Sequence, residues 1–235
     1  HEARGEFLLL LNNDTEIIEP QWLGEMVRHG LRPEVGVVGA RLLFPNGTLQ
    51  HAGVVMGLGI ASHAFTDAPP DQPGYMIRAR LAQNYSAVTA ACMLVPRHLY
   101  LSLGGMDETD LKVLYNDVDF CLRVREQGKQ IAWTPNATLV HKASVSLEKI
   151  MEGPTLEKQR AQAYGEHHTM LQRWLKWMAF DPAYNRNLTQ ESNHFGIETD
   201  QALTWDPVWR PAPRILAYPG DLAGCGEYRI IGPCR

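Results

Sequence analysis

The chain has 235 residues, of which 45% are hydrophobic and 20% charged, with a formal net charge of −4. This composition is ordinary for a globular protein, and the charge offers no basic field that would favour nucleic acid. No apolar stretch approaches the roughly 20 residues that cross a bilayer, and no signal-peptide pattern is present. The four cysteines form no CxxC pair, which argues against a zinc site and for reduced cytosolic thiols: Cys92, Cys121, Cys225 and Cys234.

The chain opens without Met on a segment that looks like the tail of a helix, and it enters an apolar run at residues 6–11 almost at once. Such a continuous run suits a strand covered on both faces, as in a parallel sheet. The chain ends at Arg235 within a segment that looks unfinished. We therefore expect a fragment cut at both ends, which lacks part of any active site.

The next elements are marked by helix and turn signals. Pro20 and Gly30 bracket a predicted helix over residues 21–29. Residues 35–44 predict a strand, and Asn46-Gly47 predicts a hairpin that returns over 48–56. Residues 57–80 are rich in Gly, Pro and Asp, and we expect a mobile loop there.

The second half of the chain continues the α/β pattern. The sequence predicts a strand over 85–95 with small residues at its centre, a short helix over 96–103, a helix over 116–127, strands over 130–133 and 138–140, and an amphipathic helix over 155–180.

We expect three parts in this chain. Residues 1–180 would form one α/β domain with a mixed, mainly parallel sheet and flanking helices, and residues 181–212 would form a linker. Residues 213–235, a short strand followed by a Gly-rich turn, would be the truncated start of a second α/β domain.

The first candidate site follows the first strand, at Asn12-Asn13-Asp14. Open α/β sheets bind ligands beyond the carboxyl ends of their strands, and Mg²⁺ or Mn²⁺ is typically shared between carboxylates and substrate phosphates. Asp14 is thus a candidate metal ligand, and the two asparagines are candidates for hydrogen bonds to ribose or phosphate. A turn or a helix cap is the alternative.

The second candidate is Asn116-Asp117-Val118-Asp119, at the start of a predicted helix. The positive end of the helix dipole favours an ionised Asp117, which suits a general base. Asp119 and Arg123 are spaced i, i+4, as in a structural ion pair. The alternative is that both carboxylates only stabilise the start of the helix.

The third candidate is His141, which follows an apolar strand and offers an imidazole that suits Mn²⁺ better than Mg²⁺. An ordinary buried histidine is the alternative. His51 is also singled out because it faces the expected loop at 57–80. Trp174 and Trp177 lie on the last helix, which either packs on the sheet or offers a face to a membrane surface.

Together these segments resemble the family 2 glycosyltransferases, the inverting GT-A enzymes, and in particular their rhamnosyltransferase-like group. The matching stretches lie in order over residues 5–146 and are GEFLLLLNNDTEIIEPQWL, VGVVGARLLFPNGTLQHAG, VTAACMLVPRHLYLSLGGMDE, NDVDFCLRVREQG and PNATLVHKASVS.

The resemblance implies a partial GT-A fold that transfers a sugar from a nucleotide-diphosphate donor. It implies that Asp14 stands at the metal-binding DxD position, that Asp117 is the catalytic base of the ED motif, and that His141 completes the shell of a divalent cation, Mn²⁺ or Mg²⁺. The residues that match positions of the donor and acceptor pocket are Gly104, Gly105, Asp107 and the segment 89–92, which includes Thr89, Ala90 and Ala91. Further candidates for donor or acceptor binding are Asn12, Asn13, His51 and Asn116.

The resemblance also implies partners. These are a nucleotide-sugar donor, a cell-surface glycan or lipid-linked acceptor, and a further glycosyltransferase domain in the same polypeptide. It implies a cytoplasmic location, with peripheral association at the inner membrane face left open.

The sequence departs from the family pattern at two positions. Asn12 replaces the first DxD aspartate and Asn116 replaces the ED glutamate, and each change removes a negative charge. The family's N-terminal half, which holds the nucleotide base, is absent, so we expect this fragment alone to be inactive. A non-catalytic sugar-nucleotide-binding or glycan-binding module and a metal-dependent phosphohydrolase remain alternatives.

Overall fold

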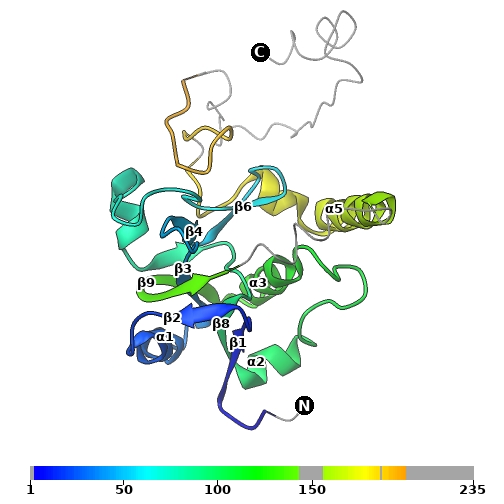
Figure 1. Ribbon diagram of the computed structural model, residues 1–235. Helices are drawn as coiled ribbons and strands as arrows, with labels where there is room; N and C mark the ends of the chain where they lie inside the picture. Colours follow the sequence, from blue (N-terminus) through cyan, green and yellow to red (C-terminus); the bar gives the residue numbers. More distant parts are fainter. Residues whose placement is uncertain (1–2, 143–155, 186, 200–235) are drawn as a thin grey trace, which may run out of the picture.

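The computed structural model describes residues 3–142, 156–185 and 187–199, which form a mixed sheet between helices (Figure 1). The strands are β1 (Phe7–Leu11), β2 (Thr15–Ile17), β3 (Val35–Leu43), β4 (Leu49–His51), β5 (Val54–Met56), β6 (Ala61–His63), β7 (Gln83–Tyr85), β8 (Cys92–Pro96) and β9 (Gln130–His141). The helices are α1 (Trp22–Gly30), the 3₁₀ helix η1 (Tyr75–Arg80), α2 (Arg97–Ser102), α3 (Asn116–Glu126) and α5 (Leu156–Ala179).

The main sheet has the strand order β1-β8-β3-β9-β2, with β4 beside β3 and β7 beside β9. β3 and β9 are directly paired and parallel, whereas β8 is antiparallel to both of its neighbours, β1 and β3. The mixed α/β sheet with flanking helices is confirmed. Fewer strand pairs are parallel than the apolar run at 6–11 predicts. β1 and β3 point the same way, but β8 lies between them and is antiparallel to both.

The sheet directs the carboxyl ends of β1 and β9 to the same edge. Thr15 on β2 lies opposite His141 at the end of β9, and the Lys142 N–H donates to the Asp14 carbonyl at 3.0 Å. The turn at residues 12–14 therefore lies beside the last residue of β9, as ligand-binding loops of α/β sheets do.

Helix α3 shows why the predicted helices form where they do. Asp117 and Asp119 lie in its first turn and Arg123 and Arg125 in its last, which complements the helix dipole. Gly128, at φ +75°, ends it with a backbone bond to the Arg125 carbonyl. Tyr115, just before the helix, adopts the left-handed region at φ 62°, a conformation that costs energy for a non-glycine residue.

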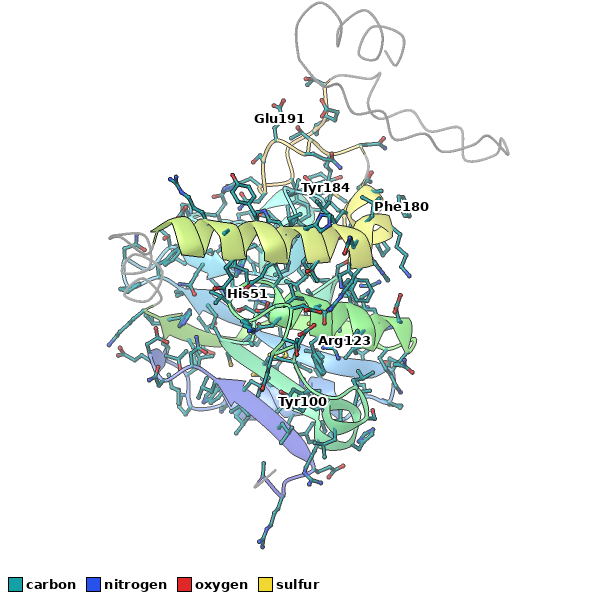
Figure 2. All side chains as sticks on the ribbon, turned by 90° about the vertical axis from the view of Figure 1, so that its right-hand side faces the viewer. His51, Tyr100, Arg123, Phe180, Tyr184 and Glu191 are labelled. Atoms are coloured by element: carbon teal, nitrogen blue, oxygen red, sulfur yellow. The ribbon has the colours of Figure 1, made fainter. Side chains whose placement is uncertain are left out.

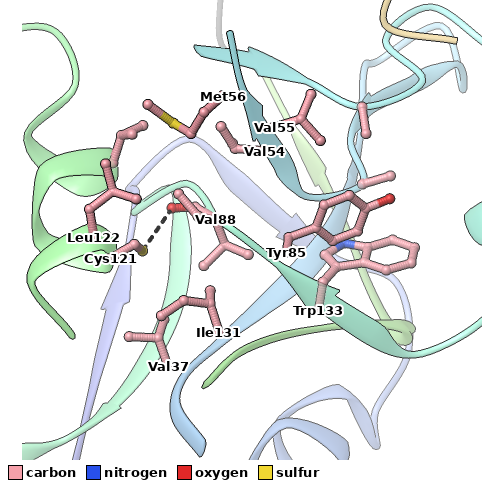
Figure 3. Close-up of a cluster of buried hydrophobic side chains, with 14 of the residues drawn as sticks. Val37, Val54, Val55, Met56, Tyr85, Val88, Cys121, Leu122, Ile131 and Trp133 are labelled. Atoms are coloured by element: carbon pink, nitrogen blue, oxygen red, sulfur yellow. Dashed lines mark hydrogen bonds between the residues drawn. The ribbon is translucent and has the colours of Figure 1, made fainter. Parts of the chain in front are cut away.

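Two apolar clusters hold the layers together. On one face of the sheet, α1 buries Trp22 and Met26 against Val38 and Leu94. On the other, α3 and the β5–β6 hairpin cover a larger cluster that contains Trp133 (Figure 3). In that cluster the buried Cys121 thiol donates to the Val88 carbonyl. Burial raises the pKa of this thiol, so Cys121 contributes to packing as a neutral side chain.

Two predicted strand boundaries are wrong. Residues 85–95 are not one strand, because β7 ends at Tyr85 and a turn at Thr89–Ala91 precedes β8. Residues 130–141, predicted as two strands around Pro135, form the single strand β9. Pro135 is tolerated because it lies in a bulge, where the β3–β9 register shifts between Ala40 and Arg41.

The segment at 57–80 is more structured than its Gly- and Pro-rich sequence predicts. It contains β6 and η1, and it anchors Phe65, Ala68 and Ala79 in the core. It is therefore a packed part of the fold rather than the mobile loop we expect from composition.

Residues 181–185 and 187–199 also differ from the predicted linker, whose remaining residues, 200–212, lie outside the described part of the chain. Phe195 is 2% exposed and stacks on Phe65 with ring centroids 4.7 Å apart, and the buried Asp181 carboxylate accepts the Met56 N–H at 2.6 Å. These residues therefore belong to the main fold. The predicted second domain at 213–235 lies outside the described residues.

Within the described part of the chain, none of the helices has both the length and the hydropathy needed to cross a membrane.

Candidate active site

The first group of site residues forms where β1 and β9 end side by side. The Oδ1 atom of Asp14 lies 3.1 Å from Nε2 of His141. The side-chain nitrogen of Asn12 lies 3.1 Å from the same Nε2. His141 is 7% exposed, whereas the Asp14 side chain is 39% exposed, so the group opens to solvent on the Asp14 side.

Gln50 fixes which nitrogen of His141 carries the proton. The Gln50 side-chain N–H donates to the His141 carbonyl at 3.2 Å, which leaves its Oε1 to face Nδ1 of His141 at 2.7 Å. Nδ1 must therefore be the donor, and Nε2 presents a lone pair. Burial lowers the pKa of His141, an effect that Asp14 partly offsets, which favours the neutral ring.

These residues fit a divalent cation. Two electron-pair donors, Asp14 Oδ1 and His141 Nε2, face each other at 3.1 Å, and adjacent ligands of an octahedral ion with bonds of about 2.1 Å also lie about 3 Å apart. An imidazole whose second nitrogen is held by a hydrogen bond is the usual arrangement of a metal-binding histidine. In the described residues no third His, Cys, Asp or Glu joins them, so substrate and water would supply the remaining ligands.

Asp117 is joined to this group through one dipeptide. The Ala90 N–H donates to Asp117 Oδ2 at 3.0 Å, and the Asn12 N–H donates to the Ala91 carbonyl at 3.0 Å. The Asp117 carboxylate also accepts the Val118 N–H at 2.8 Å. The turn at 89–91 thus contacts both the candidate base and the segment that carries the candidate metal group.

A histidine that the sequence analysis does not single out lies beside this site. Nδ1 of His63, on β6, is 3.1 Å from Nδ1 of the fully buried His51. The Thr89 N–H approaches Nε2 of His51 at 3.5 Å. Burial lowers the pKa of His63, whereas Asp117 raises it, which places His63 within electrostatic reach of the candidate base. No local pattern reveals His63, because a hairpin brings it to His51.

Asp119 has the structural role that the sequence predicts. It is fully buried, and its predicted ion pair with Arg123 is confirmed at 2.8 Å. Arg123 is labelled in Figure 2. Its other oxygen accepts the Trp174 indole N–H at 2.9 Å and lies 3.3 Å from Arg173. Trp174 is 4% exposed, so this face of α5 packs on α3, and the alternative of a membrane-surface face does not apply to Trp174.

Three predicted pocket residues lie in the loop that follows α2 and contacts α3 and α5. Gly104 and Gly105 end α2 at φ +75° and +72°, and the Gly105 carbonyl accepts a bond from Arg123. Asp107 forms an ion pair with Arg173 at 2.7 Å. The polar contacts of this loop run to α3 and α5, so the structure accounts for these residues by loop anchoring.

The other predicted pocket residues lie at the site or its edge. Asn13 is an exposed turn residue beside Asp14, and Asn116 is the first residue of α3. Thr89 lies in the turn rather than inside a strand, and its hydroxyl accepts the Ala91 N–H at 3.3 Å.

Comparison with known sequences finds two relatives. The chain is 46% identical to the uncharacterized protein y4gI of Sinorhizobium fredii (strain NBRC 101917 / NGR234) over 199 residues, which are 84% of this chain and 22% of that protein. It is 38% identical to the O-antigen biosynthesis protein RfbC of Myxococcus xanthus over 244 residues, which cover 98% of this chain and 18% of that protein. The chain thus spans about a fifth of each relative, and no protein-family model matches it.

Comparison with solved structures finds weaker similarities. The mannosyltransferase PcManGT from Pyrobaculum calidifontis, in complex with GDP-Man and Mn²⁺, is 13% identical at a TM-score of 0.40, over 74% of this chain and 51% of that chain. GalNAc-T7 with UDP, GalNAc and Mn²⁺ is 10% identical at a TM-score of 0.44, over 78% and 43%. By sequence, the chain is therefore similar over nearly its whole length to a segment of a protein named for O-antigen biosynthesis.

Proposed function

We propose that the chain carries the reaction centre of a family 2 glycosyltransferase of the GT-A type. The enzyme would move a sugar from a nucleotide-diphosphate donor to a hydroxyl of a cell-surface glycan or its lipid-linked precursor. The observation that carries the proposal is the joining of Asp14, His141 and Asp117 through the turn at 89–91. The 38% identity to a protein named for O-antigen biosynthesis supports the glycan as acceptor class.

Asp14 and His141 would hold the divalent cation, Mn²⁺ or Mg²⁺, with Gln50 orienting the imidazole. The ion, when bound, neutralises negative charge on the departing nucleoside diphosphate. The amide nitrogen of Asn12 lies 3.1 Å from Nε2 of His141, and Asn12 would release this contact when the ion takes the one lone pair of Nε2. An asparagine in place of a carboxylate leaves fewer anionic ligands, which favours a weakly held, exchangeable ion.

Asp117 would act as the base that takes the proton from the acceptor hydroxyl. Two backbone N–H groups hold its carboxylate, those of Ala90 and Val118, and the first turn of α3 favours its charged form. The deprotonated hydroxyl would attack the anomeric carbon on the face opposite the leaving group. A single displacement of this kind inverts the anomeric configuration.

The proposal extends to the setting of the enzyme. We propose a cytoplasmic enzyme with peripheral association at the inner membrane face, where a lipid-linked acceptor is reached. We also propose a further glycosyltransferase domain in the same polypeptide, in keeping with the small share of each relative that this chain spans.

Hydrolysis of nucleotide sugars by the complete protein that carries this chain tests the proposal. A donor screen with Mn²⁺, with Mg²⁺ and with EDTA should find release of nucleoside diphosphate from one donor class, dependent on metal and accelerated by a glycan acceptor. A non-catalytic binding module would bind a donor or glycan without releasing product. A phosphohydrolase would cleave nucleotide diphosphates that carry no sugar.

A further inference from the structure

A second pocket, of about 420 Å³, opens beside β3 and β9 and is lined by two arginines, Arg41 and Arg80. Arg41 projects from β3, and Arg80 is the last residue of η1. Thr138 on β9 also lines this pocket and is three residues from His141. The pocket and the metal group therefore draw residues from the same strand, β9.

The two guanidinium groups lack an anionic partner. Among the described residues neither arginine forms an ion pair within 4 Å. The Arg41 guanidinium donates to the Pro70 carbonyl and that of Arg80 to the Asp71 carbonyl, but a neutral carbonyl does not cancel a positive charge. Arg80 is exposed and is solvated by water, whereas Arg41 is half-buried, so the missing counter-charge is costly only at Arg41.

Arg41 also leaves a donor unused. Its Nε atom is buried and has no hydrogen-bond partner. Buried polar side-chain atoms nearly always have a partner, so an orphaned one calls for an explanation such as a ligand. Burial lowers the pKa of Arg41, Glu19 raises it in part, and Arg80 lowers it by a smaller amount.

One carboxylate, Glu19, lines the same pocket. It stands more than 4 Å from both guanidinium groups by the criterion for an ion pair, so it weakens the positive field without pairing. An incoming oxyanion would meet two guanidinium groups and one carboxylate. Guanidinium groups bind planar or tetrahedral oxyanions through paired N–H bonds, and the pocket has room for a phosphate or diphosphate group.

We infer that the pocket between Arg41 and Arg80 is a binding site for an oxyanion, of the phosphate or carboxylate class, separate from the metal group. The anion would accept hydrogen bonds from the guanidinium groups of Arg41 and Arg80, and it would reach the buried Nε–H of Arg41 only if that side chain moved. It would be a second anchor, beside the strand that ends at His141, for a substrate that carries a negative charge.

Titration of the complete protein with inorganic pyrophosphate in EDTA tests this site, because without metal the Asp14–His141 group offers no cation to bind the probe. Isothermal titration calorimetry should give saturable binding that Arg80→Ala weakens at least about tenfold, since a charged hydrogen bond contributes roughly 1.5–3 kcal/mol. Arg32→Ala is the matched control, because it removes the same charge from an exposed arginine that pairs with Glu34. Asp14→Asn should leave this binding unchanged.

Glu19→Gln distinguishes an anion site from a loose internal ion pair. We expect it to tighten pyrophosphate binding several-fold, because the repelling carboxylate is removed. Parallel titrations with inorganic phosphate and glucuronate separate a phosphate site from a carboxylate site. Equal pyrophosphate binding by the Arg80→Ala and Arg32→Ala variants would overturn the inference. So would a Glu19→Gln variant that binds no anion and loses as much stability as an Arg41→Gln variant, because Glu19 and Arg41 would then act as an internal ion pair.

Discussion

Asp14 and His141 face each other at 3.1 Å through two atoms that both carry lone pairs, because Gln50 holds the ring proton of His141 on the opposite nitrogen. Two such atoms repel each other unless a cation or a proton lies between them. Since burial also lowers the pKa of His141, a metal ion is the better match near neutral pH. This contact links two segments of the chain that are more than a hundred residues apart.

Replacing Asp14 with Asn should weaken Mn²⁺ binding to the complete protein by at least about tenfold, since a charged contact is worth roughly 1.5–3 kcal/mol. Electron paramagnetic resonance of free Mn²⁺ measures the affinity directly. Glu16→Gln is the matched control, because Glu16 is an exposed carboxylate on the adjoining strand, 3.4 Å from Lys142. Equal Mn²⁺ affinity in both variants would remove Asp14 from the metal site.

His51→Leu should loosen the turn that holds Asp117. Leucine fills the buried volume but accepts no bond from Thr89 and offers none to His63. We expect the free energy of unfolding to fall by about 1–3 kcal/mol, the cost of buried groups left unpaired, and kcat to fall while Mn²⁺ affinity is kept. Urea unfolding and steady-state kinetics measure the two effects. The exposed His98→Leu serves as control, and an unchanged kcat in His51→Leu would argue against this coupling.

Asp119→Asn should be the most destabilising of these changes. The Asp119 side chain is 1% exposed, pairs with Arg123 and accepts the Trp174 N–H. The variant leaves the Arg123 charge beside a neutral amide. Removing one partner of a buried ion pair costs roughly 3–5 kcal/mol. Glu126→Gln removes an exposed partner of Lys176 and should cost less than about 1 kcal/mol. Thermal unfolding compares the two, and similar melting temperatures would contradict a scaffold role for Asp119.

The loop at 104–110 should release from α5 in acid. Burial raises the pKa of Asp107, but this effect is outweighed by hydrogen bonds from the Asp110 N–H, the Arg173 side chain and the Thr109 N–H. Together they lower the pKa of Asp107 to about 2. A lowered folded-state pKa gives stability that is complete above the unfolded value near 3.8 and is lost as pH falls towards 2. Urea midpoints should therefore fall more steeply between pH 4 and 2 in the wild type than in Asp107→Asn. The exposed Asp71→Asn should follow the wild type, and parallel wild-type and Asp107→Asn curves would contradict the assignment.

The elements that follow strong local patterns could be predicted from the sequence. Helix α3 has acidic residues in its first turn, basic ones in its last and a glycine after its end, and strand β3 is a long apolar run that leads to an Asn-Gly turn. For these segments the local preference and the tertiary environment agree. The pairing of Asp119 with Arg123 follows from the same helical spacing.

The parts that depend on distant contacts could not be predicted in this way. The turn at 89–91 has a sequence that suits a strand, yet it breaks the strand because Ala90 binds Asp117 and Ala91 binds Asn12. Asp107 is a candidate pocket residue by sequence, but its position is fixed by Arg173, 66 residues away. Similarly, His63 reaches the site only through the pairing of β5 with β6.

The most direct test of the central claim is single-turnover sugar transfer by Asp117→Asn in the complete protein, with donor and Mn²⁺ affinities measured alongside. The variant keeps the shape of the side chain and no longer takes up a proton. Its amide oxygen can still accept the Ala90 N–H, but its NH2 group cannot accept the Val118 N–H. The account predicts unchanged donor and Mn²⁺ binding with a loss of transfer of about 10²-fold or more. Transfer at the wild-type rate would contradict it.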